Sequence, residues 1–149
     1  MTIDKDLIKK KLSFLDYQLS RIEEMNLDKK EFIENADIHD LITFRLQQSV
    51  ETCIDIATHI IAALNLERKE RAKDAFILLG FEKIIKHDLA LRMGKAADFR
   101  NRVVHGYNDF DFSLLFKDYK KDIGDLRDFG GQILDYLQKE SETQSWKKT

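Results

Sequence analysis

The sequence has no proline, only six glycines and a single cysteine among its 149 residues. Proline and glycine form most of the tight turns between strands, so an all-β fold lacks its usual turn residues here. A single cysteine, Cys53, excludes an internal disulfide and favours a reducing compartment, the cytoplasm. Because Cys53 lies on an apolar helical stripe, we expect it to be a small buried side chain rather than a nucleophile.

Long apolar runs are also absent. No stretch approaches the roughly 20 apolar residues that a membrane-spanning helix needs, and the charged N-terminus, Met1 to Lys5, is unlike a secretory signal. The net charge of −2 does not by itself indicate a nucleic-acid-binding protein. Residues 82–105 are locally basic, with six Lys or Arg against three Asp or Glu. A charge run of that size is most often a solvated helix face.

The apolar residues recur at helical spacing along nearly the whole chain. They predict helices at about 4–25, 28–34, 37–64, 68–80, Phe81 or Asp88 to Val104, and 113–140. Asn26 and Asp28 mark the end of the first of these, and Gly80 is expected to close helix 68–80. We therefore predict an all-α protein with one domain over residues 1–149, an antiparallel up-and-down bundle of four or five helices. Residues 141–149 are expected to be a frayed polar tail.

Three of the predicted helices carry a clear buried stripe. The stripe of helix 4–25 alternates spacings of four and three, at Ile8, Leu12, Leu15, Leu19 and Ile22. Helix 37–64 has such a stripe from Val50 to Leu64, with additional apolar residues that suggest a second buried face, such as a dimer contact. On helix 113–140 the predicted inward residues are Leu115, Tyr119, Ile123, Leu126, Ile133 and Leu137. Gly130-Gly131, inside this helix, costs roughly 2 kcal/mol of helix propensity and suggests close helix packing or a kink.

The candidate catalytic residues lie in one stretch near the end of the fifth predicted helix, Arg100-Asn-Arg-Val-Val-His105-Gly106-Tyr107. On a continuous helix, residues five apart diverge by about 140° around the axis. Gly106 stands where a left-handed helix cap is expected. A helix that ends near Val104 would let His105 leave the helical path and approach the same phosphate as Arg100.

These residue types suit cleavage of RNA without a metal ion. RNA carries its own nucleophile, the 2′-hydroxyl, so the enzyme needs a base, an acid and positive charge for the transition state. His105 can transfer protons near neutral pH, and Arg100 is a permanent cation with a planar fork that grips phosphate. Asn101 and Arg102 are supporting candidates, for a hydrogen bond and for phosphate steering. Since one copy supplies one such histidine, a base and an acid together suggest a dimer.

Structural explanations exist for each of these residues. His105 could only complement the dipole at a helix C-terminus. Arg100 could pair with a nearby acid such as Asp98 or Asp109, and Tyr107 could be a half-buried aromatic side chain.

The remaining polar candidates are weaker. Asp55 and His59 lie four residues apart on the long helix and could contact each other, either in support of the site or as a structural pair. His39 and His87 are expected at the surface. No cluster has zinc-ligand spacing and no glycine-rich phosphate loop is present, so no metal or cofactor is expected.

The motif Arg100-x4-His105-x-Tyr107 resembles the signature of the HEPN superfamily, specifically its HepT-like branch. Residues 44–63 resemble that branch's long second helix, and the similarity extends over about residues 5–140. The resemblance implies a dimeric helical bundle whose two motifs face each other in a cleft. It also implies a ribonuclease toxin encoded beside a small nucleotidyltransferase antitoxin, which can attach AMP to the motif tyrosine, here Tyr107.

Three functions follow, in order of preference. The first is a metal-independent endoribonuclease toxin that leaves a 2′,3′-cyclic phosphate and is neutralised by a nucleotidyltransferase. The second is a non-catalytic partner that presents nucleotide or substrate to a nucleotidyltransferase, although such a protein has no need of His105. The third is a structural dimer without chemistry, in which the basic stretch is only surface.

Overall fold

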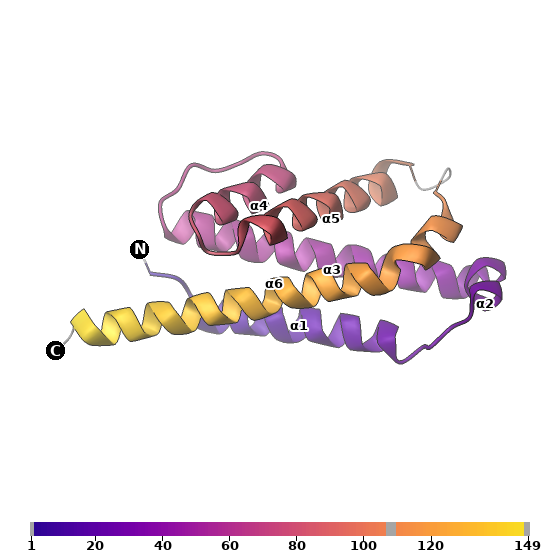
Figure 1. Ribbon diagram of the computed structural model, residues 1–149, viewed down its shortest axis with the longest axis horizontal. Helices are drawn as coiled ribbons and strands as arrows, with labels where there is room; N and C mark the ends of the chain where they lie inside the picture. Colours follow the sequence, from indigo (N-terminus) through magenta and orange to yellow (C-terminus); the bar gives the residue numbers. More distant parts are fainter. Residues whose placement is uncertain (1, 107–109, 148–149) are drawn as a thin grey trace.

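The computed structural model describes residues 2–106 and 110–147, with side chains up to Thr143. Over these ranges the chain is helical and contains no strand (Figure 1). The helices are α1 (Lys5–Glu23), α2 (Lys29–Glu34), α3 (Ala36–Ala63), α4 (Ala72–Phe81), α5 (His87–Gly106) and α6 (Phe112–Lys147). In the described part of the chain, no helix is long and apolar enough to cross a membrane.

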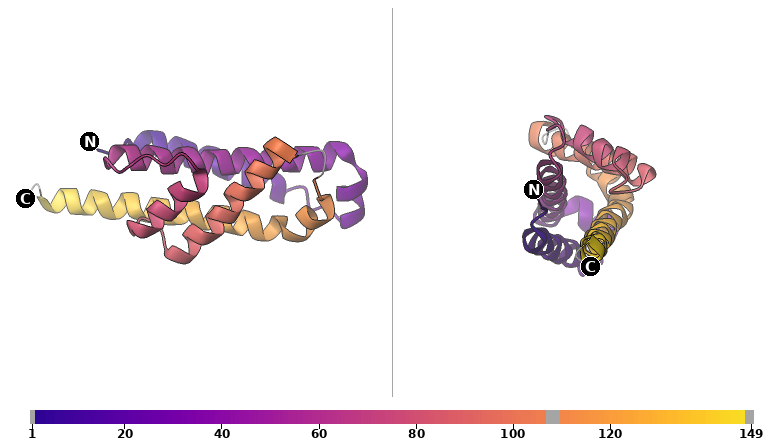
Figure 2. Two further views of the ribbon diagram at one scale, coloured as in Figure 1. Left: turned by 90° about the horizontal axis from the view of Figure 1, so that it is seen from above. Right: turned by 90° about the vertical axis from the view of Figure 1, so that its left-hand side faces the viewer.

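The long helices run antiparallel to their neighbours along the chain. Helices α1, α3 and α6 lie along the long axis of the molecule, while α4 and α5 cross them obliquely as a hairpin (Figures 1 and 2). The short helix α2 closes one end, and both termini lie at the other. The predicted all-α antiparallel bundle is therefore confirmed, and the homodimer stays a prediction.

The predicted stripes form the core. All five stripe residues of α1 are buried, as is Cys53 on α3. The predicted stripe from Val50 to Leu64 consists of Val50, Cys53, Ile54, Ala57, Ile60, Ile61 and Leu64. Only Ile54 and Leu64, the residue that follows α3, remain partly exposed. The inward face of α6 is buried at every predicted position, which are Leu115, Tyr119, Ile123, Leu126, Ile133 and Leu137.

Several helix ends differ from the prediction. Glycine was expected to close the helix before the α5 segment, but the left-handed residue there is Lys83, with φ of 59°. The N–H of Ile84 donates to the carbonyl of Leu79 (2.9 Å), as in a Schellman motif. Helix α6 continues to Lys147, so the predicted helix end near Glu140 is wrong.

Two further expectations need correction. Gly130 packs on α1, but a Cβ built there would lie 3.6 Å from Leu12 and Leu15, and one at Gly131 would meet open space. Neither glycine is required by close packing. His39 is not a surface residue, because its ring stacks on Phe112 at 3.8 Å and its Nδ1 lies 3.0 Å from the carbonyl oxygen of Phe32. His87 is exposed, as predicted.

Candidate active site

Helix α5 carries the Arg100–His105 motif and is fixed to α6 at its first half. Arg92 donates hydrogen bonds to Asp125 (2.7 Å) and Asp128 (2.8 Å) of α6, and also to Asp88 one turn earlier on α5 (3.0 Å). One guanidinium thus bridges two helices through its fork. The N–H of Lys86, just before α5, donates to the side chain of Gln132 on α6 (2.8 Å).

The hairpin with α4 and a cluster of aromatic rings fix the rest of α5. Gly80 lets α4 approach closely, since a Cβ built on it would lie 2.7 Å from the Cβ of Ala90. Lys73 of α4 pairs with Asp98 of α5 at 3.4 Å. Near the motif, the rings of Phe99 and Phe110 meet edge to face at 5.7 Å. These contacts therefore fix α5 up to the start of the motif.

Arg100 points toward α3. Its Nη1 donates to Oε1 of Glu51 at 2.9 Å, and the two side chains are only 24% and 34% exposed. The Nε of Arg100 is buried and has no hydrogen-bond partner in the described part of the chain. Arg100 therefore does form an ion pair, as the structural explanation suggested, but its partner is Glu51. Asp98, the acid named there, pairs with Lys73 instead. Asp109 lies outside the described residues.

His105 lies in the last turn of α5 and is exposed. The predicted helix end near Val104 is wrong, because α5 continues through Gly106. The predicted left-handed cap is wrong as well, since no glycine in the described ranges has a positive φ. His105 therefore stays on the helical path, about 140° around the axis from Arg100. Within one copy the structure does not bring the two side chains together.

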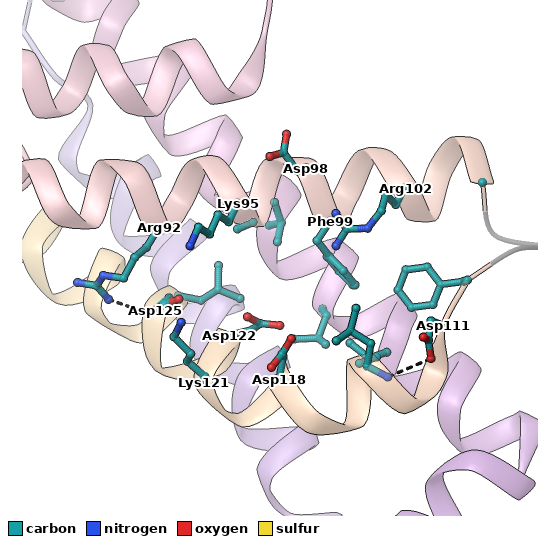
Figure 3. A pocket seen from close by; sticks show the side chains of 18 residues that line it. Arg92, Lys95, Asp98, Phe99, Arg102, Asp111, Asp118, Lys121, Asp122 and Asp125 are labelled. Carbon is teal, nitrogen blue, oxygen red and sulfur yellow. Dashed lines mark hydrogen bonds and ion pairs between the residues drawn. The ribbon is translucent and has the colours of Figure 1, made fainter.

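The supporting candidates on α5 face other surroundings. Asn101 is exposed. Arg102 lines a groove between α5 and α6 with a cavity volume of about 610 Å³, whose floor includes Leu46 and Val50 of α3. In Figure 3, Arg92, Lys95 and Arg102 of α5 stand opposite a row of α6 carboxylates, Asp118, Asp122 and Asp125.

The carboxyl group of Asp122, which lines this groove, has a raised pKa. Burial, and then repulsion from Asp118 and Asp125, raises its pKa to about 6. The positive charges of Lys121 and Arg102 oppose this increase without cancelling it. The groove therefore holds a carboxyl group that gains a proton just below neutral pH.

The pair predicted on α3 is not formed. Asp55 pairs instead with Lys11 of α1 at 3.6 Å, and His59 is exposed. No contact joins Asp55 to His59 among the residues that the structure describes. Tyr107, the predicted modification site, lies outside the described residues.

Sequence reasoning missed Glu51. It precedes Asp55 by one turn and His59 by two turns on the same side of α3, so the polar face of this helix was a usable signal. The three acids that hold Arg92 were also missed, although Asp125 and Asp128 share a face of α6.

The chain matches the family model described as Ribonuclease HepT-like over residues 15–133. It is 27% identical over 124 residues to the mRNA nuclease HepT of Shewanella oneidensis, covering 83% of this chain and 93% of that protein. It is 34% identical over 104 residues to the tRNA nuclease HepT of Aphanizomenon flos-aquae, covering 69% and 68% of the two chains.

Solved structures of similar proteins have the same helical fold as this chain. A tri-AMPylated Shewanella oneidensis HEPN toxin in complex with an MNT antitoxin superimposes with a TM-score of 0.81 at 26% identity, over 87% of this chain and 98% of that one. YutE of Bacillus subtilis has the same fold, with a TM-score of 0.81 at 20% identity over 94% and 95% of the two chains. The family match spans most of the bundle and includes the whole Arg100–Tyr107 motif. This chain therefore belongs to the HepT-like ribonuclease family of the HEPN superfamily.

Proposed function

We propose that this chain is the ribonuclease toxin of a toxin–antitoxin pair and that it cleaves RNA at the Arg100–His105 motif without a metal ion. The family to which the chain belongs is one of ribonucleases, and one of its relatives has been solved as a toxin with its antitoxin bound. We place this toxin in the cytoplasm, where its RNA substrates are and where a chain with a single cysteine needs no disulfide.

The observation that carries the proposal is the placement of two complementary groups at one end of α5. Arg100 is half-buried and held by Glu51, whereas His105 is exposed in the last turn of the same helix. A fixed cation and an exposed group that can transfer protons are what cleavage by the 2′-hydroxyl needs.

In the proposed reaction, the 2′-oxygen loses its proton to a histidine and bonds to phosphorus. The bond from phosphorus to the 5′-oxygen breaks, and a second group, which acts as an acid, gives that oxygen a proton. The products are a 2′,3′-cyclic phosphate and a free 5′-hydroxyl. Arg100 stabilises the charge that gathers on the non-bridging oxygens.

One copy supplies a single His105, and on α5 this side chain diverges from Arg100. Two copies with facing motifs would supply a base and an acid and would bring an arginine of one copy near a histidine of the other. We therefore propose a homodimer as the active form. Activity per chain should fall when the protein is diluted to concentrations at which ultracentrifugation finds monomer, and constant activity on dilution would contradict this.

The central test is cleavage of RNA in EDTA by wild type, His105→Ala and Arg100→Ala. The matched control is His87→Ala, which removes an exposed histidine from the other end of α5. We expect cleavage by wild type and the control, with a 2′,3′-cyclic phosphate product, and a loss of at least about 100-fold in the two motif variants. Full activity of His105→Ala would reject the proposed chemistry. Because one relative is an mRNA nuclease and another a tRNA nuclease, both RNA classes should be offered.

We further propose that a nucleotidyltransferase antitoxin controls the chain by transferring AMP to Tyr107. The support is the motif resemblance together with the AMPylated state of the solved relative. If the neighbouring gene encodes a nucleotidyltransferase, co-expression with it should add AMP-sized mass increments to the peptide that contains Tyr107. The Tyr107→Phe variant should lose the increments. Inhibition without any mass increase would favour simple binding by the antitoxin instead.

A further inference from the structure

Glu51 of α3 is the hydrogen-bond acceptor that the structure gives to Arg100. Its Oε1 accepts from Nη1 at 2.9 Å, and both side chains are about two-thirds to three-quarters covered. An ion pair in such a half-buried place is screened less than a surface pair, so its geometry is better defined.

Among the described residues, Glu51 is the hydrogen-bond acceptor found for the Arg100 guanidinium. The Nε is enclosed but finds no acceptor among the described residues. Asp98, the acid nearest in sequence, is engaged by Lys73 at 3.4 Å. An arginine has several rotatable bonds and loses substantial entropy when fixed, so an acceptor on the neighbouring helix α3 strongly influences where its fork points.

Phosphate recognition by arginine depends on that orientation, because the planar fork meets two phosphate oxygens only in a restricted geometry. The carboxylate at Nη1 restricts the orientation of the guanidinium, and an arginine has further N–H donors that can reach a phosphate. The long rigid helix α3 supplies the carboxylate, and the packed backbone of α5 supplies the arginine.

We propose that Glu51 is a positioning residue, which orients the Arg100 guanidinium for the phosphate at the cleavage point. This inference rests on the proposed function of Arg100. Glu51 itself takes no part in proton transfer and acts only through the arginine.

Loss of positioning has a kinetic signature that differs from loss of charge. In Glu51→Ala the cation remains, so RNA still binds, but the guanidinium is no longer fixed in the transition state. We expect kcat to fall by about 10-fold to 100-fold while KM changes by less than about 3-fold. Glu51→Gln keeps an oxygen acceptor at the same reach and should retain most of the wild-type kcat.

The matched control is Asp16→Asn, which removes a carboxylate from another ion pair with the same 2.9 Å separation, that of Asp16 on α1 with Arg127 on α6. It should leave both kinetic constants unchanged. All variants are assayed well below their measured melting temperatures, so a loss of fold stability alone does not move kcat.

The experiment measures kcat and KM in EDTA, on the RNA that wild type cuts, for Glu51→Ala, Glu51→Gln and each in an Arg100→Lys background. If Glu51 acts through Arg100, Glu51→Ala should have a much smaller effect in the Arg100→Lys background than in wild type. Equal effects in the two backgrounds, or wild-type kcat in Glu51→Ala, would overturn the positioning role while leaving the role of Arg100 intact. A rise in kcat would also overturn it and identify the pair as an inhibitory latch. If Arg100→Ala keeps full activity, the proposed function fails and the inference fails with it.

Discussion

Replacing Asp122 with asparagine should stabilise the protein at neutral pH. Asp122 lies on α6 in the groove between α5 and α6, with Asp118 and Asp125 on the same side of the helix (Figure 3). Burial and the repulsion of these two carboxylates raise its pKa from 3.8 to about 6. At pH 7.5 the folded protein must therefore hold a carboxylate where its surroundings prefer a neutral group.

The direction of the pH effect on stability depends on whether the folded or the unfolded chain binds the Asp122 proton more tightly. The folded state binds the Asp122 proton more tightly than the unfolded chain does. Protonated Asp122 therefore contributes to the free energy of unfolding, and this contribution is fully present below the unfolded pKa of 3.8. It is lost as the pH rises through the folded pKa of about 6. A difference of about 2 between the two pKa values corresponds to at most roughly 3 kcal/mol. Because the side chain is partly exposed to solvent, we reduce this to about 1–2 kcal/mol.

Asparagine has nearly the same shape and carries no charge at any pH, so it avoids this cost. At pH 7.5 we expect Asp122→Asn to melt about 3–6 °C above wild type. The advantage should shrink between pH 7 and pH 4 and vanish near pH 4, where wild type is itself protonated. Thermal unfolding followed by circular dichroism across this range measures both effects.

The control is Asp135→Asn, the same substitution at an exposed position of the same helix. It should leave the melting temperature within about 1 °C of wild type at every pH. The reasoning would be refuted if Asp122→Asn brought no stabilisation at pH 7.5, or if its advantage were the same at pH 4 and pH 7.5.

Two further predictions concern the packing. Gly80→Ala should destabilise the protein by about 1–2 kcal/mol in urea unfolding, since its new Cβ would lie 2.7 Å from that of Ala90, whereas Gly131→Ala, which meets open space, should stabilise it by up to about 1 kcal/mol; the reverse order would contradict the close approach of α4 and α5. Burial raises the pKa of the Cys53 thiol, so native protein at pH 8 should react with a thiol reagent such as DTNB only as fast as it unfolds. Rapid stoichiometric labelling of the native state would show that Cys53 is accessible.

The helices could be predicted because the buried residues of a helix recur in its own sequence with helical spacing. The alternating stripe of α1 and the inward face of α6 repeat with the period of a helix, and those positions are the buried ones. Such local periodicity also predicts the antiparallel bundle, because short connections between amphipathic helices leave few other arrangements.

The ends of α4 and α5 were predicted less well because glycine, Gly80 and Gly106, was expected to mark them, whereas Asn26 was expected after α1. The left-handed positions fall on Asn26, Asn65 and Lys83, with φ of 39°, 57° and 59°. Asparagine tolerates this conformation, but lysine has no such preference. Lys83 adopts it because the motif lets Ile84, a buried residue, enter the core directly after α4. Tertiary packing here overrides the local preference of the chain.

The candidate site shows the same limit. Arg100 and His105 could be recognised from their spacing in a single string of residues, and the family match agrees with the resemblance of that string. The partner of Arg100 could not, because Glu51 lies 49 residues earlier and meets it only where α5 crosses α3. Local sequence favoured Asp98, two residues away, but on a helix residues two apart do not face each other.

The course of α5 bears on the proposed mechanism of the motif. If Gly106 capped the helix in the left-handed conformation, a single copy could bend His105 toward Arg100. Because α5 continues through Gly106, the two side chains leave the helix about 140° apart, one held toward α3 and the other exposed. An arginine anchored on one side of its helix and a histidine free on another can meet a single phosphate most simply when the histidine comes from a second copy. The dilution experiment therefore tests more than the oligomeric state, since a catalytically active monomer would require the end of α5 to unwind when RNA binds.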